Sequence, residues 1–401
     1  MATKNIDLCL LYIFPILSYI GFYYVGFDVR LWKMLWLITV PLFFIYVFKT
    51  IVQQRVSPLF KSMRLFLVAE IVSIFMAYLL WGQSLVLTYR AMMNLWSILY
   101  FFFLVKTGFE KKQLEWYVWI NIGLYLVLWL YALSQVPITV FGYDMDKEID
   151  DARGFFRIDI ANRGCVYLGL FMALNKWKEN KRKIWILVAA GCFLLVVLML
   201  TRQSIALSVV VAGYYLFRRS KHILIYLFLL SFIAFCFVNA KFAEDSVLGA
   251  LITLSKQQME EQKSGNENIR FSEFRYYTTE YTHNVVGYLL GNGTPHYDSS
   301  YGKYELKLQK VHEYYGSDVG WAWFFAQFGL LGIFAMAKIF WHGLRKKVPR
   351  DMEYAKYFLG FLGLYHIASN AIVTDMIYFC IAIYLIDCLA VSKKAINLKF
   401  A

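Results

Sequence analysis

Residues 184–200 read IWILVAAGCFLLVVLML, and TRQS at 201–204 interrupts the apolar sequence before a second run at 204–217. A helix of seventeen residues is about 26 Å long at 1.5 Å per residue, close to the hydrocarbon thickness of a bilayer, about 30 Å. Backbone groups in lipid must be hydrogen-bonded within their own segment, which favours a helix. This stretch therefore predicts two membrane-crossing helices joined by a reversal of a few residues.

The same pattern recurs along the chain, in which 60% of residues are hydrophobic and 19% aromatic. Soluble domains contain nearer one half apolar residues. We therefore expect an all-α polytopic membrane protein with about twelve transmembrane helices. The expected spans are 8–27, 31–48, 65–81, 91–105, 115–134, 161–177, 184–200, 204–217, 223–240, 318–340, 354–374 and 376–391. The first is interpreted as a spanning helix and not as a cleaved signal peptide.

The basic residues predict the orientation of these helices. With the N-terminus inside, more than half of the 41 Lys and Arg fall in short connections on the cytoplasmic side, as the positive-inside rule requires. Both termini are then cytoplasmic, and the net charge of +14 is explained without nucleic-acid binding. The six cysteines all lie in expected spans without CxxC spacing, so neither a disulfide framework nor a metal site is predicted.

A large polar loop lies between the ninth and tenth expected spans, at residues 241–316. It divides the chain into 1–240 with helices 1–9, the loop to residue 317, and 318–401 with helices 10–12 and a cytoplasmic tail. Residues 267–283 have helical periodicity, as do residues 246–263, and Gly291–Pro295 predicts a turn. Membrane enzymes acting on lipid-linked substrates at one face often carry such an insert, so we expect the chemistry here.

Arg202 is the sharpest single candidate, because a guanidinium at a membrane interface needs a partner and suits phosphate oxygens. The alternative is an arginine that only anchors a helix end. Arg270 and Arg275 are about 140° apart around a helix axis, so they do not lie on one face. One can point into a site while the other pairs with a nearby acid such as Glu273 or Glu280. Asp318 opens the tenth span, either as a helix cap or as a general base.

Secondary candidates are Arg157 and His312. Arg157 lies in the excursion before the sixth span, where it either adds positive charge to the outer face or pairs with the acidic run at 144–151. His312 is a remote candidate base, since the loop histidines have no metal-ligand spacing. Tyrosines in the loop form either a sugar-stacking surface or an interfacial aromatic belt. The tyrosines concerned are Tyr297, Tyr301, Tyr304, Tyr314 and Tyr315.

Taken together, these residues resemble the O-antigen ligase and polymerase superfamily, most closely the Wzy-type repeat-unit polymerases. The resemblance rests on the helix count with its large loop and on four motifs, mostly in the second half of the chain. The motifs are Thr201-Arg202-Gln203-Ser204, Arg270-x-x-x-Phe274-Arg275, Leu289-Leu290-Gly291-Asn292-Gly293, and Asp318-Val319-Gly320 with Gly329-Leu330-Leu331-Gly332.

The resemblance implies a GT-C-like, metal-independent glycosyltransferase of the bacterial inner membrane, with a periplasmic loop and no cofactor. Its donor and acceptor would be undecaprenyl-pyrophosphate-linked oligosaccharides that become O-antigen or capsular polysaccharide. Arg202, Arg270 and Arg275 would bind the pyrophosphate, while Arg270 and Asp318 would be catalytic. Membrane lipid and a chain-length regulator are the further partners that it implies.

Two alternatives remain open. A ligase would transfer the finished glycan to another acceptor, and typical ligases have a His-Asn pair where this chain has Ser317-Asp318. Here His283-Asn284 comes earlier, which favours a polymerase. A flippase of lipid-linked oligosaccharide would need two related halves and short outer loops, which this sequence lacks.

Overall fold

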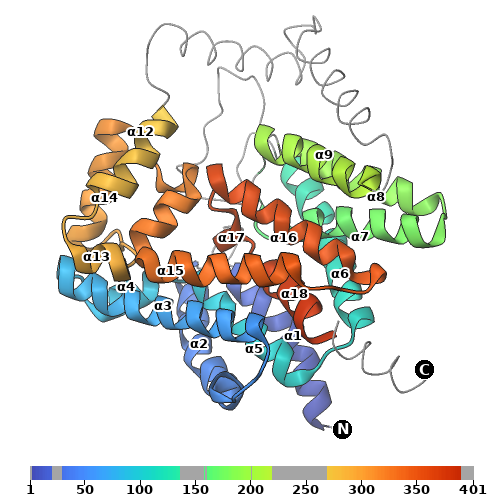
Figure 1. Ribbon diagram of the computed structural model, residues 1–401, viewed down its shortest axis with the longest axis horizontal. Helices are drawn as coiled ribbons and strands as arrows, with labels where there is room; N and C mark the ends of the chain where they lie inside the picture. The colour runs from blue at the N-terminus through green and yellow to red at the C-terminus, as the bar shows by residue number, and fades with distance from the viewer. Residues whose placement is uncertain are drawn as a thin grey trace, which may run out of the picture.

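The computed structural model of the chain describes residues 2–19, 29–135, 158, 160–199, 201–218 and 269–389 (Figure 1). Every regular element in these ranges is a helix, which confirms the all-α class. The expected span 223–240, the expected loop helix 246–263 and Arg157 lie outside the described residues.

The helices before the large loop are α1 (Ala2–Tyr19), α2 (Val29–Val52), α3 (Pro58–Trp81), α4 (Leu85–Ala91), η2 (Leu95–Ile98), α5 (Leu99–Thr107), α6 (Lys111–Ser134), α7 (Gly164–Asn180), α8 (Ile184–Leu198) and α9 (Arg202–Phe217). Those within the described part of the loop are α12 (Ile269–Arg275), η4 (Tyr276–Glu280), α13 (Val285–Leu290), α14 (Ser300–His312) and η5 (Gly316–Asp318). The chain continues with α15 (Gly320–Arg345), η6 (Arg350–Met352), α16 (Glu353–Tyr365), η7 (His366–Ala368), α17 (Ala371–Thr374), α18 (Met376–Tyr384) and η8 (Leu385–Leu389).

Four helices among the described residues are long and apolar enough to cross a membrane: Lys33–Val52 of α2, then α3, α6 and α15. A fifth is obtained if α4 and Leu95–Thr107, which bend by 66°, are counted as one span. Large apolar side chains on these helices face outward, as at Ile45, which is 70% exposed. Such surfaces suit contact with lipid tails. The helices are thus compatible with a multi-pass membrane protein, whereas the expected twelve crossings are not confirmed.

Several expected spans are shorter or interrupted in the structure. The run 91–105 is broken, because α4 ends at Ala91 and α5 begins only at Leu99. Helix α18 has nine residues, each at most 1% exposed, and continues directly into η8 at Leu385. Such a segment is apolar because protein surrounds it on all sides. The length of an apolar run therefore does not show by itself that its helix is continuous or that it faces lipid.

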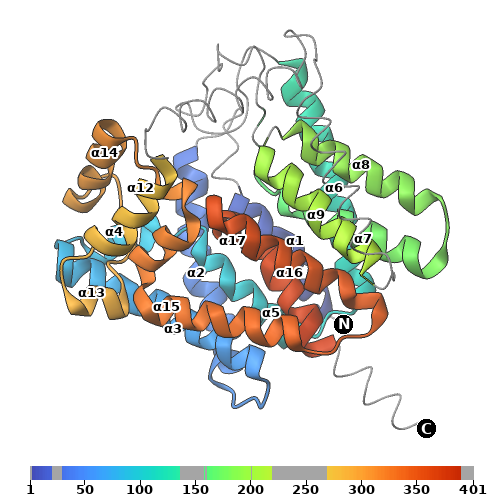
Figure 2. The same ribbon diagram turned by 45° about the horizontal axis from the view of Figure 1, so that its top comes forward.

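The packing places the described part of the loop at one end of the helix bundle. Helices α3 and α15 lie side by side in both ribbon views, and α7 packs on α8 and α16 (Figures 1 and 2). We call residues 269–318 the loop segment; it holds α12 to η5 and lies on the left in Figure 1, where α13 packs on α15 and α3. The turns α7–α8 and α15–α16 lie at the opposite end.

Candidate functional site

The candidate site is formed around Arg270, where four segments far apart in the sequence meet. We call Arg270, Asp318, Gln203 and the Ala368 carbonyl the Arg270 cluster. Arg270 Nη2 lies 3.8 Å from Asp318 Oδ2. With the Gln203 amide oriented by its hydrogen bonds, its oxygen accepts from Arg270 Nη1 at 2.5 Å and its nitrogen donates to Ala368 O at 2.9 Å. The Arg270 and Asp318 side chains are 46% and 44% exposed, so a ligand can reach both.

Glu273 fixes the position of α12 in this cluster. It follows Arg270 by three residues, so both side chains lie on one face of the helix. Glu273 Oε1 accepts a hydrogen bond of 2.5 Å from the backbone N–H of Tyr315, three residues before Asp318. This bond ties α12 to the η5 segment and so holds Arg270 opposite Asp318.

Glu273 is also electrostatically unusual, since it is only 1% exposed. The pKa of its carboxyl is raised from 4.5 to about 7, mainly by burial and also by Asp318, while the Tyr315 N–H and Arg270 act to lower it. Its Oε2 has no hydrogen-bond partner among the described residues. Glu273 therefore takes up a proton near neutral pH directly beside the cluster. From the sequence, Glu273 is predicted only as a partner for a nearby arginine. Its i, i+3 relation to Arg270 is the signal that could have placed it in the candidate site.

Asp318 does not cap the helix that it precedes. It is the last residue of η5, while the N-cap position of α15 is Val319, which makes no side-chain cap bond. The interaction that the structure gives the Asp318 carboxylate is with Arg270. The capping alternative is therefore wrong for this side chain, and the carboxylate is available to a substrate group.

The TRQS reversal contributes to the Arg270 cluster through the first residues of α9. Arg202 is the first residue of this helix and its side chain is partly buried, while Gln203, the next residue, bridges Arg270 and Ala368. The start of α9 and the start of α12 thus meet, although more than sixty residues separate them in the sequence. Gln203 was not recognised from the sequence, because a single amide in a turn carries no pattern.

The two glycine motifs fit into one another. Gly329 interrupts α15 with φ of +61°, and Gly291 has φ of +84°, both in the region that favours glycine. A Cβ on Gly291 would lie 2.1 Å from Gln327 O, and one on Gly329 would lie 2.4 Å from Gly291 N. Backbone approaches this close require glycine at both positions.

The kink at Gly329 also leaves carbonyl groups of α15 without a hydrogen bond inside the helix, and the Gly291–Gly293 turn supplies their partners. The backbone N–H groups of Asn292 and Gly293 donate to Ala326 O and Gln327 O at 2.9 and 3.0 Å. Because buried backbone groups need partners, kink and turn stabilise each other. Together they hold the first half of α15, which begins just after Asp318, against the glycine turn of the loop segment.

Two other candidate residues, Arg275 and His312, contact residues outside the Arg270–Asp318 pair. Arg275 Nε is 4.0 Å from Glu280 Oε1, with both side chains well exposed; this agrees with the predicted separation of Arg270 and Arg275 around the helix. His312 ends α14, is exposed, and has its ring centroid 5.6 Å from that of Tyr314. Their proposed roles, like that of Arg157, stay predictions.

The loop tyrosines divide between packing and an open cavity. Tyr301 is fully buried and stacks on Trp81 with ring centroids 4.3 Å apart. Tyr297 is 63% exposed and lines a cavity of 240 Å³ together with Trp323 and Ser317, the residue before Asp318. Aromatic rings at this point offer a surface for the apolar faces of sugars.

The Arg270 cluster can hold an anion and a hydroxyl side by side, through a guanidinium fork and a neighbouring carboxylate. In the part of the chain that the structure describes, no group of three His, Cys, Asp or Glu side chains is arranged to hold a metal ion. A scan against protein-family models found no family that matches this chain, and a search of the curated proteins found no match either.

Proposed function

We propose that this protein is a membrane-embedded glycosyltransferase that polymerises oligosaccharide repeat units carried on undecaprenyl pyrophosphate into O-antigen or capsular polysaccharide. The observation that supports it best is the half-exposed Arg270–Asp318 pair, at 3.8 Å, beside the start of α9. Three of the motifs on which the superfamily resemblance rests contribute a residue to the Arg270 cluster, namely Gln203, Arg270 and Asp318. The reaction would occur at the periplasmic face of the bacterial inner membrane.

In the proposed reaction, the acceptor hydroxyl attacks the anomeric carbon of the donor glycan. The glycosidic bond forms as the bond from the anomeric carbon to the pyrophosphate oxygen breaks, and the lipid pyrophosphate leaves. Arg270 and Arg202 would neutralise the charge that develops on this leaving group, because fixed donors aimed at developing charge lower the barrier strongly. Asp318 would orient the hydroxyl and accept its proton. Arg275 would support the charge from further away.

The test is a gel profile of surface polysaccharide from a deletion strain complemented with variants. Arg202→Ala and Arg270→Ala should each lower polymer by about 10²-fold or more, the typical effect of removing one charge-stabilising donor. Asp318→Asn should be equally inactive, because the amide keeps the shape but cannot accept a proton. Lys307→Ala is the matched control, since it removes an exposed cation from α14 in the same loop segment.

The products in the deletion strain separate this proposal from its alternatives. Loss of the ladder, with single repeat units still reaching the surface, is the outcome expected of a polymerase. Loss of all surface glycan, with lipid-linked polymer outside the inner membrane, would instead indicate a ligase. Single units that accumulate on the cytoplasmic side would indicate a flippase and refute an enzymatic role. In this structure Asn284 caps α13, accepting from Gly287 N–H at 2.6 Å, so the asparagine of the His283-Asn284 pair has a structural role.

A further inference from the structure

A second charged cavity lies at the end of α9 opposite to Arg202. It has a volume of 690 Å³ and is formed by α9, α16 and the carboxyl end of α15 with its following turn. Arg218, on its wall, follows Arg202 by sixteen residues, about 24 Å along a helix. The cavity is thus separate from the Arg270 cluster, and we call it the basic cavity.

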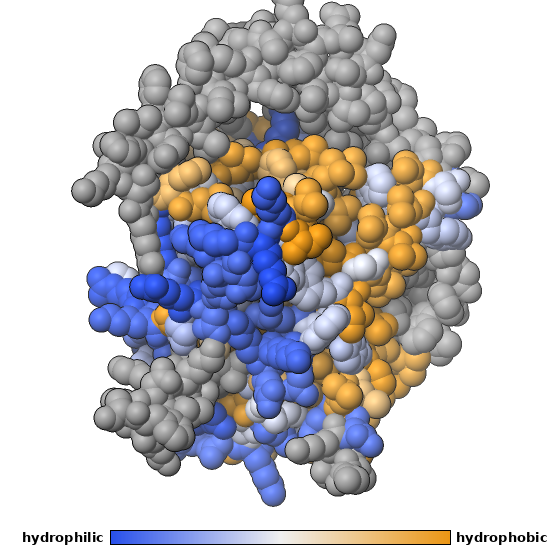
Figure 3. All heavy atoms as spheres, turned by 90° about the vertical axis from the view of Figure 1, so that its right-hand side faces the viewer, coloured by the Kyte–Doolittle hydropathy of each residue, from blue (hydrophilic) through white to orange (hydrophobic). Residues whose placement is uncertain are grey.

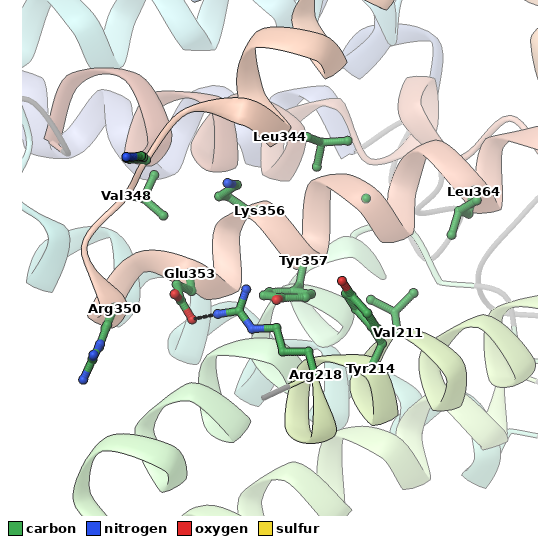
Figure 4. Close-up of a pocket in the computed structure, with 12 residues that line it drawn as sticks. Val211, Tyr214, Arg218, Leu344, Val348, Arg350, Glu353, Lys356, Tyr357 and Leu364 are labelled. Atoms are coloured by element: carbon green, nitrogen blue, oxygen red, sulfur yellow. Dashed lines mark hydrogen bonds and ion pairs between the residues drawn. The ribbon is translucent and has the colours of Figure 1, made fainter. Parts of the chain in front are cut away.

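One end of the basic cavity is strongly positive. Four bases and one acid line it, which leaves an excess of three positive charges; they are Arg218, Lys347, Arg350, Lys356 and Glu353. Arg218 pairs with Glu353 and lies 5.1 Å from the Tyr357 ring centroid. Figure 4 shows this pair at the centre of the cavity. Lys347 and Arg350 are exposed and pair with no acid among the described residues, so they are free to bind an anion.

The other end of the basic cavity is apolar. Val211 lies seven residues before Arg218, a distance of about 10 Å along a helix. Leu364 lies eight residues after Lys356 on α16, a distance of about 12 Å. Figure 4 shows Val211 and Leu364 on one side of the view and Glu353 on the other. The lining therefore changes from charged to apolar along a single direction, as an amphiphilic ligand requires.

We propose that the basic cavity binds an anionic phospholipid, with the phosphate of its headgroup against Lys347, Arg350 and Arg218 and an acyl chain along Val211 and Leu364. Arginine and lysine at such a place bind phosphate through charge-assisted hydrogen bonds. Clusters of basic residues between helices at the cytoplasmic face bind anionic headgroups in this manner. A soluble phosphate compound shares the headgroup chemistry but has no part to place on the apolar wall.

The surroundings of the basic cavity fit a membrane boundary. Seen from the right-hand side of Figure 1, hydrophilic residues gather on one part of the surface next to broad hydrophobic areas (Figure 3). The turns α7–α8 and α15–α16 lie at this end of the molecule. The inference rests on the cytoplasmic placement of these turns that the basic residues predict, and it does not depend on the proposed polymerase activity.

The first experiment measures lipid binding to the purified full-length chain in detergent by native mass spectrometry. Phosphatidylglycerol and phosphatidylcholine are titrated separately, and the former should bind preferentially. The double variant Lys347→Gln with Arg350→Gln should weaken phosphatidylglycerol about 30-fold, at about 1 kcal/mol for each basic residue. The control is Arg182→Gln with Lys183→Gln, which removes two exposed bases from the α7–α8 turn at the same end and should change binding less than threefold.

A second variant blocks the apolar end without changing charge. Gly360 lines the basic cavity, and a Cβ added to it would have its nearest neighbour, the Leu344 Cδ2 atom, at 3.9 Å, an ordinary contact. Gly360→Leu is therefore chosen to occupy the space for the acyl chain. It should weaken phosphatidylglycerol while leaving inorganic pyrophosphate, titrated as a soluble probe, unaffected.

Three outcomes would overturn the proposal. If the Lys347/Arg350 and Arg182/Lys183 double variants weakened phosphatidylglycerol binding equally, the lipid would be attracted to the basic face in general and not to the basic cavity. Equal binding of phosphatidylglycerol and phosphatidylcholine would mean that the cations do not select the headgroup. Pyrophosphate binding as tight as lipid, with no effect of Gly360→Leu on lipid, would assign the cavity to soluble phosphate compounds.

Discussion

Replacing Glu305 by Gln tests whether burial controls the stability of the loop segment. Glu305 on α14 is 5% exposed, and burial raises the pKa of its carboxyl from 4.5 to about 7, although Tyr277 donates to Oε2 at 3.3 Å. Because the folded state binds the proton more tightly than the unfolded state, stability is full below about pH 4.5 and falls as the pH rises through 7. Between pH 5 and pH 8 the loss from this one group is about 2–3 kcal/mol.

The assay is thermal unfolding of the purified protein in detergent at pH 5 and pH 8. Glu305→Gln, which carries no ionisable group, should unfold at a clearly higher temperature than wild type at pH 8 and close to wild type at pH 5. Burial shifts the Glu273 pKa in the same direction, so the comparison between the two proteins is what isolates Glu305. Glu313→Gln, at the exposed end of α14, is the control, and its difference in unfolding temperature from wild type should not depend on pH. An equal difference at both pH values would refute the reasoning.

Two further substitutions test packing in the helix bundle by thermal unfolding in detergent. Gly329→Ala should destabilise the protein by more than Gly82→Ala: both have positive φ, which costs about 1–2 kcal/mol for alanine, but only Gly329 has backbone atoms within 3 Å of the added Cβ. Equal effects would mean that kink and turn do not interlock. Glu70→Met should stabilise by about 1–3 kcal/mol, because Glu70 is fully buried in α3 and neither carboxyl oxygen has a hydrogen-bond partner among the described residues. A lower unfolding temperature would show that its carboxyl is satisfied.

Local patterns in the sequence were sufficient to predict the helical class and the separate candidates of the site. Apolar runs predict helices because each helix satisfies its own backbone, and α3, α6 and α15 appear close to the predicted positions. The sequence predicts Arg270 as a candidate on a helix of the large loop and Asp318 as a candidate at the start of the tenth span, and the structure brings the two together. Helical geometry also predicted that Arg270 and Arg275 do not lie on one face, although it did not say which of the two points into the site.

What the sequence did not predict depends on contacts between distant segments. An apolar run reads the same whether lipid or protein surrounds it, so the sequence does not predict that α18 is enclosed by protein. The kink at Gly329 was not anticipated, because the carbonyls it frees are satisfied by N–H groups of the Gly291–Gly293 turn. The bridging role of Gln203 arises in the same way, from the meeting of α9 with α12.

An ion pair as exposed as Arg270–Asp318 contributes little to stability, about 0–1 kcal/mol, so separating its partners costs correspondingly little. A pyrophosphate group presents several oxygens to a guanidinium fork and therefore competes well with one carboxylate oxygen at 3.8 Å. When pyrophosphate replaces Asp318 as the partner of Arg270, Asp318 itself would stay in place, because the interlocked kink and turn hold the start of α15. Without its counter-ion, the carboxylate becomes a stronger acceptor for an incoming hydroxyl. In the proposed reaction, donor binding and activation of the acceptor are thus coupled through Arg270.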